Sequence, residues 1–225
     1  MKLTVVIPVF NERGTIEAIL ERVKRSPFEK EILVVDDGST DGTREYLEGL
    51  EDPEIRLIRH HRNQGKGAAV RTGIAASTGD LLVIQDADLE YSPDDYPELL
   101  KPIVDGNADV VYGSRFLGIH RVFMFWHYAA NKTLTFLTNI LFNTMLTDME
   151  TCYKAFRGEV IRELPLRSNG FDIEPEITAK IFKRNYRVYE IPITYHGRTY
   201  EEGKKITWRD AIFALWALLK FRFQD

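Results

Sequence analysis

The fold is decided by a stretch of sequence that reads Leu81-Leu82-Val83-Ile84-Gln85-Asp86-Ala87-Asp88-Leu89-Glu90. Its apolar residues predict a buried strand, and two carboxylates spaced one residue apart follow them. Since successive side chains of a strand point to opposite faces, Asp86 and Asp88 are expected to share a face. Such a pair is suited to one hard divalent cation, which takes its other ligands from water and substrate phosphates. The alternative is that both aspartates lie in a turn and cap the next helix.

Short apolar runs alternate with helical patterns through the rest of the first half. Strands rich in Val, Ile and Leu, separated by one helix each, imply right-handed crossovers. They predict an α/β protein with a mostly parallel central sheet and helices on both faces. The predicted strands cover 3–8, 31–36, 55–60, 80–85 and 108–113, and the predicted helices cover 15–25, 43–50, 67–77 and 96–104.

The ends of these predicted strands carry acids, amides and glycines. Ligands of open α/β sheets bind outside the carboxyl ends of the strands, so we expect these loops to meet at one crevice. Taken singly, each has a structural explanation: Asn11 would cap the first helix, Asp41 the second, and the glycines would permit tight turns. The loops in question are 8–12, 36–43, 63–67 and 86–90.

The familiar phosphate-binding motifs are absent from the sequence. No G-x-G-x-x-G follows the first predicted strand, and Gly65-Lys66-Gly67 lacks the earlier glycine of a Walker loop. This segment nevertheless opens a predicted helix, where free N–H groups and the helix dipole favour an anion, and Lys66 adds a positive charge. A diphosphate is therefore expected either there or on the metal.

The composition places the chain among globular proteins. Its 225 residues fit one large domain or two small ones, and 44% hydrophobic residues suffice for a packed core. The single cysteine, Cys152, excludes an internal disulfide framework and suits a reducing compartment. We see no signal peptide before the first predicted strand, and we predict a cytoplasmic protein.

The net charge of −4 hides a difference between the two halves. Residues 1–115 carry 14 Lys/Arg and 22 Asp/Glu, whereas residues 116–225 carry 16 and 12. An acidic chain without a Lys/Arg-rich run is a poor candidate for nucleic-acid binding. The basic second half suits anionic small groups or a lipid surface better.

Residues 116–147 contain no acid and are rich in aromatic side chains. The uncharged run 133–147 is shorter than the ~20 residues that span a bilayer. Its leucines at helical spacing suit a helix that packs on the core or on a second subunit, as in a homodimer. A helix lying at lipid headgroups looks similar, so peripheral contact with the cytoplasmic face of a membrane is the alternative. The apolar segment 211–219 presents the same choice.

Taken together, four segments resemble family 2 glycosyltransferases, which have the GT-A (Rossmann-like) fold. Residues 113–116 with Arg198, Gly203 and Lys204 resemble, within that family, the polyprenyl-phosphate glycosyltransferases such as dolichol-phosphate mannose synthases. The four segments that carry the family resemblance are Val6-Ile7-Pro8-Val9-Phe10-Asn11-Glu12, Val35-Asp36-Asp37-Gly38-Ser39-Thr40-Asp41-Gly42-Thr43, Asn63-Gln64-Gly65-Lys66-Gly67-Ala68-Ala69 and Asp86-Ala87-Asp88.

The resemblance implies a role for each matching residue. Asp88 would bind the metal, Mg²⁺ or Mn²⁺, with Asp86 beside it and Glu90 as a third ligand, where mannose synthases tend to carry Gln. The predicted donor-binding residues are Pro8, Asn11, Glu12, Asp36, Asp37, Gly65, Lys66, Gly67 and Asp86. The predicted catalytic residues are Arg115, which would face a phosphate, Asp148 as catalytic base or acceptor-site acid, and Arg198 and Lys204 of a loop that closes on phosphates.

The implied reaction is metal-dependent transfer of a hexose from a nucleotide sugar, of GDP-mannose or UDP-glucose type, with inversion. A lipid monophosphate acceptor, with a second pKa near ~6, is already largely ionised and needs cations more than a base. The basic second half therefore favours a polyprenyl or dolichyl phosphate. A soluble saccharide acceptor and a non-catalytic nucleotide-sugar-binding module are the alternatives. We predict one catalytic domain over 1–225, with a donor half (1–115) and an acceptor half (116–225) that contains amphipathic helices.

Overall fold

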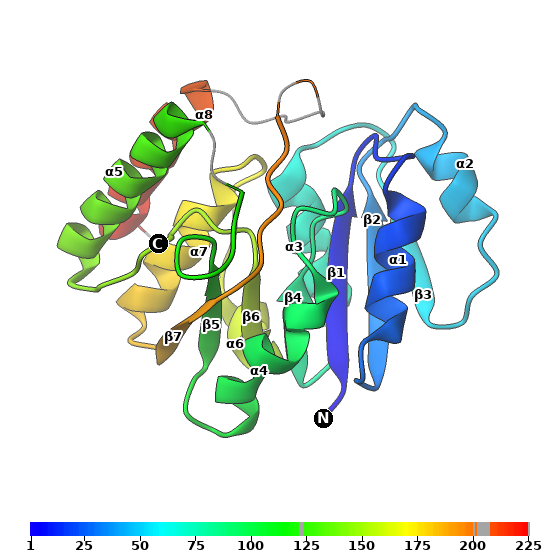
Figure 1. Ribbon diagram of the computed structural model, residues 1–225, viewed down its shortest axis with the longest axis horizontal. Coiled ribbons are helices and arrows are strands. Elements are labelled where there is room, and N and C mark those ends of the chain that lie inside the picture. Colours follow the sequence, from blue (N-terminus) through cyan, green and yellow to red (C-terminus); the bar gives the residue numbers. More distant parts are fainter. Residues whose placement is uncertain (122–123, 200, 202–207, 225) are drawn as a thin grey trace.

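The computed structural model describes residues 1–121, 124–199, 201 and 208–224, and within these ranges it contains one seven-stranded sheet (Figure 1). The strands are β1 (Leu3–Val9), β2 (Lys30–Asp36), β3 (Ile55–Arg59), β4 (Leu81–Ile84), β5 (Val110–Ser114), β6 (Lys154–Arg157) and β7 (Val188–Pro192). The helices are α1 (Ile16–Arg25), α2 (Thr43–Glu48), α3 (Lys66–Ala76), α4 (Tyr96–Val104), α5 (Phe125–Phe142), α6 (Gly158–Glu163), α7 (Ile173–Lys183) and α8 (Trp208–Phe223), with a short 3₁₀ turn at Pro93–Asp95.

The sheet has the order β3-β2-β1-β4-β6-β5-β7. The pairs β1–β2, β1–β4, β2–β3 and β5–β7 are parallel, and β6 runs antiparallel to both of its neighbours. The prediction of a mostly parallel α/β sheet is therefore confirmed. The five strands expected in the first half all form, with ends that differ by one or two residues from the predicted ones.

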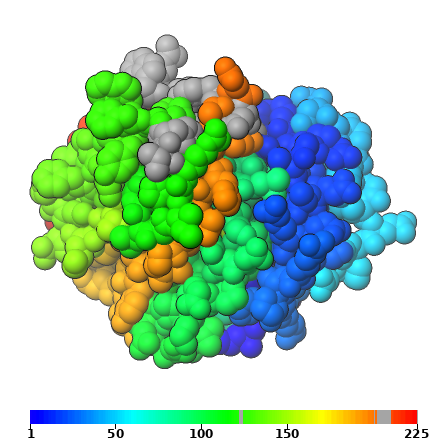
Figure 2. Space-filling view, viewed as in Figure 1, coloured from blue at the N-terminus to red at the C-terminus, as the bar shows by residue number. Residues whose placement is uncertain are grey.

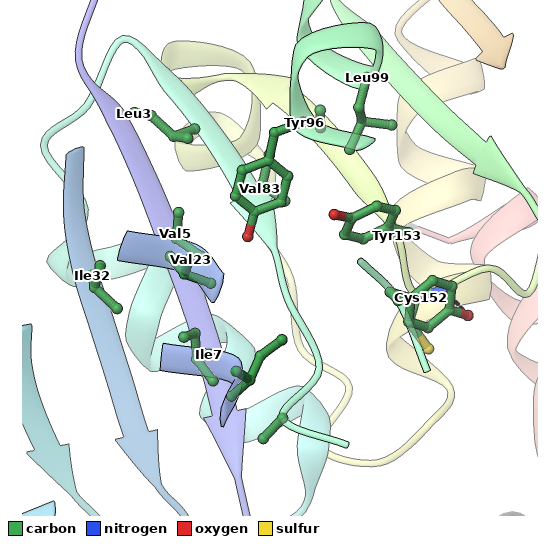
Figure 3. Close-up of a cluster of buried hydrophobic side chains, with 14 of the residues drawn as sticks. Leu3, Val5, Ile7, Val23, Ile32, Val83, Tyr96, Leu99, Cys152 and Tyr153 are labelled. Atoms are coloured by element: carbon green, nitrogen blue, oxygen red, sulfur yellow. Dashed lines mark hydrogen bonds between the residues drawn. The ribbon is translucent and has the colours of Figure 1, made fainter. Parts of the chain in front are cut away.

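Helices cover both faces of the sheet, as predicted. In β1, neighbouring side chains divide between two cores: Val5 packs with α1 and α4, and Val6 packs with α3, α5, α7 and α8. Figure 3 shows the first core, in which Leu3, Val5 and Ile7 lie with Val23 of α1. Cys152 is a buried free thiol in this same core.

One glycine fixes how closely a helix lies on the sheet. A Cβ at Gly73 of α3 would lie 2.3 Å from Cγ1 of Val6, so the helix could not keep its place with a larger residue there. This close packing sets the position of the α3 N-terminus, and with it Lys66, at the edge of the sheet where β1 and β4 end.

Candidate active site

The loops that follow β1 and β2 meet, as their positions after parallel strands predict. Asn11 does not cap α1. Instead, its backbone N–H donates to Ser39 Oγ (3.0 Å) and its Oδ1 accepts the N–H of Thr40 (2.8 Å). Asp41 does serve the second helix, because its carboxylate accepts the N–H of Thr43 at 3.0 Å. Pro8 lies in β1 itself, paired with Val35 of β2.

The two aspartates of the D-x-D segment lie beyond the strand. β4 ends at Ile84, and residues 87–90 form turns and bends, so strand alternation does not orient these side chains. Asp86 pairs with Lys66 of α3, whose Nζ lies 2.6 Å from Oδ1. Burial alone would lower the pKa of Lys66, but the Asp86 carboxylate raises it well above its usual value.

Asp88 pairs with a residue that comes from the far end of the sequence. Its Oδ2 lies 2.8 Å from Nη2 of Arg198, and its Oδ1 accepts the N–H of Glu90 at 3.1 Å. In Figure 1 the chain after β7 (orange) rises across the middle of the molecule toward the ends of β1 and β4. This path brings Arg198 to Glu12 as well, at 3.4 Å from Oε2.

Negative charge exceeds positive charge around this site. Burial and the charges of Asp86 and Glu90 raise the pKa of Asp88, Arg198 lowers it, and the net result is a pKa of about 7. The four carboxylates here, Glu12 included, contact two cations, Lys66 and Arg198. An excess of hard oxygen donors fits a divalent cation whose remaining ligands come from a diphosphate.

The predicted three-carboxylate metal site is not assembled. Within the part of the chain that the structure describes, no three His, Cys, Asp or Glu side chains lie where they could hold one metal ion. Glu90 is the residue that departs from the prediction: its Oε2 accepts from the Tyr195 hydroxyl (2.8 Å) and its Oε1 from the N–H of Arg198 (2.7 Å). Asp86 and Asp88 remain the pair suited to a cation.

Asp36 and Asp37, predicted to bind the donor, are buried and hydrogen-bonded to protein groups. Asp36 accepts from Nε of Arg44 (2.7 Å) and from the N–H of Ser39 (3.0 Å). Asp37 lies 2.7 Å from Nδ1 of His60 and accepts the N–H of residues 64 and 65. In this structure the two carboxylates hold the loops in place.

The start of α3, predicted to receive an anion, lies against a loop that the sequence did not single out. Gly65 has a φ of 99°, and a Cβ there would lie 2.3 Å from the carbonyl oxygen of Asn169. A Cβ at Gly67 would lie 2.5 Å from the carbonyl oxygen of Ser168, and the N–H of Ala68 donates to Asn169 O (3.1 Å). Both glycines are therefore needed for backbone contact.

Arg115 and Asp148 form a buried two-point ion pair on the second-half side. Nε and Nη2 of Arg115 each lie 2.7 Å from one oxygen of Asp148, which has no exposed surface. Asp148 also accepts the backbone N–H of Arg115 at 3.0 Å. Because both oxygens of this carboxylate are occupied by Arg115, the geometry favours the acceptor-site role over that of a base.

Several site residues carry no signal in the sequence. Tyr195 and Glu190 lie in or after β7, which was not predicted, and Glu190 accepts the backbone N–H of Thr147 and Asp148 (both 3.0 Å). The Oε1 atom of Glu150 is buried, and it has no hydrogen-bond partner in the part of the chain that the structure describes. Lys204, a predicted catalytic residue, lies outside the described residues.

A second surface lies on α5 and α8, which pack against each other at one edge of the molecule (Figure 1), and α5 (green) forms that edge in Figure 2. One side of α8 packs inward through Ala214, Ala217, Leu218 and Phe221. None of the helices in the described ranges combines the length and the hydropathy needed to cross a bilayer. The exposed large apolar side chains of the two helices are Phe125, Trp126, Tyr128, Phe136, Ile140, Ile212, Phe213, Trp216, Leu219 and Phe223, which we call the apolar edge.

Sequence comparison places these features among sugar transferases. Residues 4–164 match the family model described as glycosyl transferase family 2. A dolichol-phosphate mannosyltransferase of Pyrococcus furiosus is 32% identical over 212 residues, which make up 91% of this chain and 59% of that relative, so the chain spans less than two thirds of its length. A polyprenol monophosphomannose synthase of Mycolicibacterium smegmatis is 32% identical over 205 residues, with 86% and 77% coverage.

Structural comparison agrees on the fold. The glucosyl-3-phosphoglycerate synthase of Mycobacterium tuberculosis, in a crystal structure with Mn²⁺, UDP and phosphoglyceric acid, superposes with a TM-score of 0.76. The match covers 100% of this chain and 79% of that one at 21% identity. The same enzyme has also been crystallised with Mg²⁺ and UDP. At this identity the likeness establishes the fold, which is GT-A-like as predicted.

Proposed function

The chain belongs to glycosyl transferase family 2, and we propose that it transfers a hexose from a nucleotide sugar to a polyprenyl or dolichyl phosphate, with inversion. The donor is of GDP-mannose or UDP-glucose type. In this proposal residues 1–115 form most of the donor site and residues 116–225 most of the acceptor site within one catalytic domain, with Arg198 reaching the donor and Arg115 the acceptor. The names of the relatives, which act on dolichol and polyprenol phosphates, support the acceptor class.

The donor part of the proposal rests on the excess of carboxylates around Asp88. Asp86 and Asp88 would hold a divalent cation, Mg²⁺ or Mn²⁺, which when bound supplies charge neutralisation for the leaving diphosphate. Lys66 and Arg198, each within hydrogen-bond distance of one of these aspartates, are placed to bind the same diphosphate. Preorganised cations of this kind stabilise charge as it develops in the transition state.

On the acceptor side, Arg115 is the cation that the fold orients. Its ion pair with Asp148, made by Nε and Nη2, fixes the guanidinium plane, and in this proposal Nη1 is the nitrogen that binds the acceptor phosphate. An acceptor phosphate that is already ionised needs such positioning and no general base.

The apolar edge supports a lipid surface as the place of reaction. Lys132, Lys220 and Arg222 lie over aromatic rings of this region, at 4.4 Å, 4.7 Å and 5.7 Å from the centroids of Phe116, Trp216 and Phe142. Aromatic side chains with cations beside them, and no acid between residues 116 and 147, are typical of helices that lie at anionic headgroups. We propose peripheral binding to such a surface, on the cytoplasmic face, and a homodimer through the same edge is the competing outcome.

The proposal is tested by transfer assays with two acceptors. GDP-mannose or UDP-glucose is supplied with Mn²⁺ or Mg²⁺, and with either an undecaprenyl phosphate in vesicles or a panel of soluble saccharides. We expect product on the lipid phosphate, loss of product with chelator, and loss with Asp88→Asn. Product that forms equally well with chelator contradicts the cation site, and the absence of donor turnover under all conditions favours the non-catalytic module.

One observation favours a second candidate, transfer to a hydroxyl group of a soluble acceptor. Burial, together with the charges of Glu174 and Asp148, raises the pKa of Glu150 to about 7, while Lys154 and Arg115 lower it. A carboxyl group with this pKa and one unpaired oxygen is suited to accept a hydroxyl proton near neutral pH. Glu150→Gln should abolish transfer to a hydroxyl acceptor and leave transfer to a phosphate nearly unchanged.

A further inference from the structure

Glu90 is surrounded by donors from one segment, residues 195–198. The Tyr195 hydroxyl donates to its Oε2 (2.8 Å), the N–H of Arg198 donates to its Oε1 (2.7 Å), and the N–H of His196 donates to its backbone carbonyl (3.0 Å). Each carboxylate oxygen therefore has a protein donor. Only 11% of this side chain is exposed.

The backbone next to Glu90 explains why it does not join the two aspartates. Leu89 has a φ of 64°, in the left-handed region that leucine rarely adopts. Three residues of extended chain would place the side chains of Asp88 and Glu90 in register, but this turn directs Glu90 toward the segment after β7. Backbone strain of this kind occurs where the surrounding structure enforces it, often at functional sites.

By binding residues 195–198, Glu90 holds Arg198 next to Asp88. Since Glu90 holds the backbone N–H of Arg198, the guanidinium reaches Asp88 with Nη2 at 2.8 Å. Among the described residues its other contacts are longer: Nη1 and Nη2 lie 3.4 Å and 3.5 Å from the oxygens of Glu12, and Nε, which makes no hydrogen bond there, lies 3.7 Å from Oε1 of Glu90. Of these contacts, the bond to Asp88 is the short one.

We infer that Glu90 is a positioning residue and not a metal ligand: it holds Arg198 on Asp88, where Arg198 and the divalent cation compete for the same carboxylate. The inference rests on the proposed function, because it takes Asp86 and Asp88 as the cation pair. A cation held by Asp86 and Asp88 would displace the guanidinium from Asp88, and the long contacts of Arg198 with Glu12 would let it bind a diphosphate oxygen instead.

Competition gives Glu90 and Asp88 opposite effects on metal affinity. When a cation must displace Arg198, its apparent affinity is reduced in proportion to the fraction of molecules in which Asp88 is free. Loosening Arg198 removes that reduction, whereas removing a true ligand weakens binding. A positioning role and a ligand role of Glu90 therefore predict changes in metal affinity of opposite sign when the residue is replaced.

The test is Mn²⁺ binding to the full chain without donor, measured by calorimetry or by the Mn²⁺ EPR signal. We expect Arg198→Ala and Glu90→Ala to bind Mn²⁺ about threefold to tenfold more tightly than the wild type, and Asp88→Ala to bind at least tenfold more weakly. If Glu90→Ala lowers the Mn²⁺ affinity as Asp88→Ala does, Glu90 is a metal ligand and the inference is wrong. If Asp88→Ala leaves Mn²⁺ binding unchanged, or no variant binds it, the cation site of the proposed function fails instead.

Hydrogen exchange supplies a readout that does not depend on metal. Glu90→Ala should raise amide exchange at His196 and Arg198 at least tenfold, because their acceptors are lost or loosened, and Glu90→Gln should give a smaller rise. Glu98→Ala, an exposed glutamate of α4, is the matched control and should leave this segment unchanged. Unchanged exchange in Glu90→Ala, with melting temperatures equal to the wild type, would also contradict the anchoring role.

Discussion

The two halves of the molecule treat their polar and apolar groups in opposite ways. In the first half, Asp36 and Asp37 are buried, and each of their four carboxylate oxygens has a hydrogen-bond partner. In the second half, an oxygen of Glu150 is buried and has no hydrogen-bond partner among the described residues, and the apolar edge is exposed.

This difference indicates that the two halves have different requirements. The donor loops are held in one arrangement before any ligand arrives, which reduces the ordering cost of binding a nucleotide sugar. The acceptor half exposes many large apolar side chains on two helices that pack together, and such exposure in a soluble monomer is typical of a surface that binds another component. The predictions below test whether this division is real.

The largest expected effect is on catalysis in the donor half. Asp88→Asn should lower transfer by about 10²- to 10³-fold, because one preorganised interaction at the leaving group is lost. The fold should persist, since the change relieves repulsion from Asp86 and Glu90. Initial rates with saturating donor, and a thermal melt, measure the two quantities.

Asp105→Asn is the control for this change. Asp105 is an exposed partner of Lys101, and surface pairs of this kind contribute little to stability. Its rate should equal that of the wild type. A fully active Asp88→Asn enzyme would contradict the cation site and with it the contrast between the halves.

The next effect concerns the rigidity of the donor loops. Gly65→Ala should lower the free energy of unfolding by about 2–3 kcal/mol, because the residue has a positive φ and the added Cβ would overlap Asn169 O. Chemical denaturation measures the loss.

Gly106→Ala separates the two causes. Gly106 also has a positive φ, of 76°, but no atom lies within 4 Å of its added Cβ. It should therefore show the strain alone, of about 1 kcal/mol. Equal losses in the two variants would show that contact with residues 168–170 does not hold the start of α3.

The third effect concerns the apolar edge of the acceptor half. The double variant Phe136→Ser/Trp216→Ser should bind vesicles of anionic lipid at least about tenfold more weakly, because burying each large apolar side chain contributes about 1.5–3 kcal/mol. Both side chains are more than half exposed, so the fold should be unaffected. Vesicle flotation measures binding.

Tyr189→Ser is the matched control, since this exposed aromatic lies on β7, away from α5 and α8. It should float as the wild type does. A wild type that never floats but sediments as a dimer, and a double variant that is monomeric, would identify the apolar edge as a subunit interface.

The strands of the first half were predictable because runs of Val, Ile and Leu identify strands buried on both faces. β6 was not, because its first residue, Lys154, is fully buried and bonded to Glu174, a pairing that no local pattern shows. β7 lies at the edge of the sheet and contains only partly buried and exposed residues, so no run of buried apolar side chains marks it. Because β7 was not predicted, Tyr195, which follows it, was not identified as a site residue either.

The site was predictable to the level of which loops meet, because parallel topology brings strand ends together. Which side chains pair was not, since Arg198 and Asp88 are 110 positions apart. The direction of Glu90 depends on the backbone of Leu89, which the sequence gives no reason to place in the left-handed region. The alternation argument for Asp86 and Asp88 failed for a related reason, because β4 ends at Ile84.

The smallest expected effect is a difference in the sign of pH dependence between one carboxylate in each half. Burial raises the pKa of Glu31, but hydrogen bonds from Thr4 and Thr78 lower it to about 2. Glu31 therefore stabilises the fold above its unfolded pKa of about 4.5, and this stabilisation is lost as the pH falls from about 4.5 to 2. Glu150, with a pKa of about 7, binds a proton more tightly in the folded state, so stability is lost as the pH rises from about 4.5 to 7.

Denaturation of Glu31→Gln and Glu150→Gln between pH 3 and 8 compares the two directly. At pH 8, Glu150→Gln should be more stable than the wild type by about 1–2 kcal/mol, and Glu31→Gln less stable by a similar amount. Both differences should shrink toward zero at the acid end, where each wild-type carboxyl group is protonated in the unfolded chain and Glu150 is protonated in the folded chain. If both substitutions destabilise at pH 8, Glu150 has a partner that holds its charge, and the acceptor half is as fully paired as the donor half.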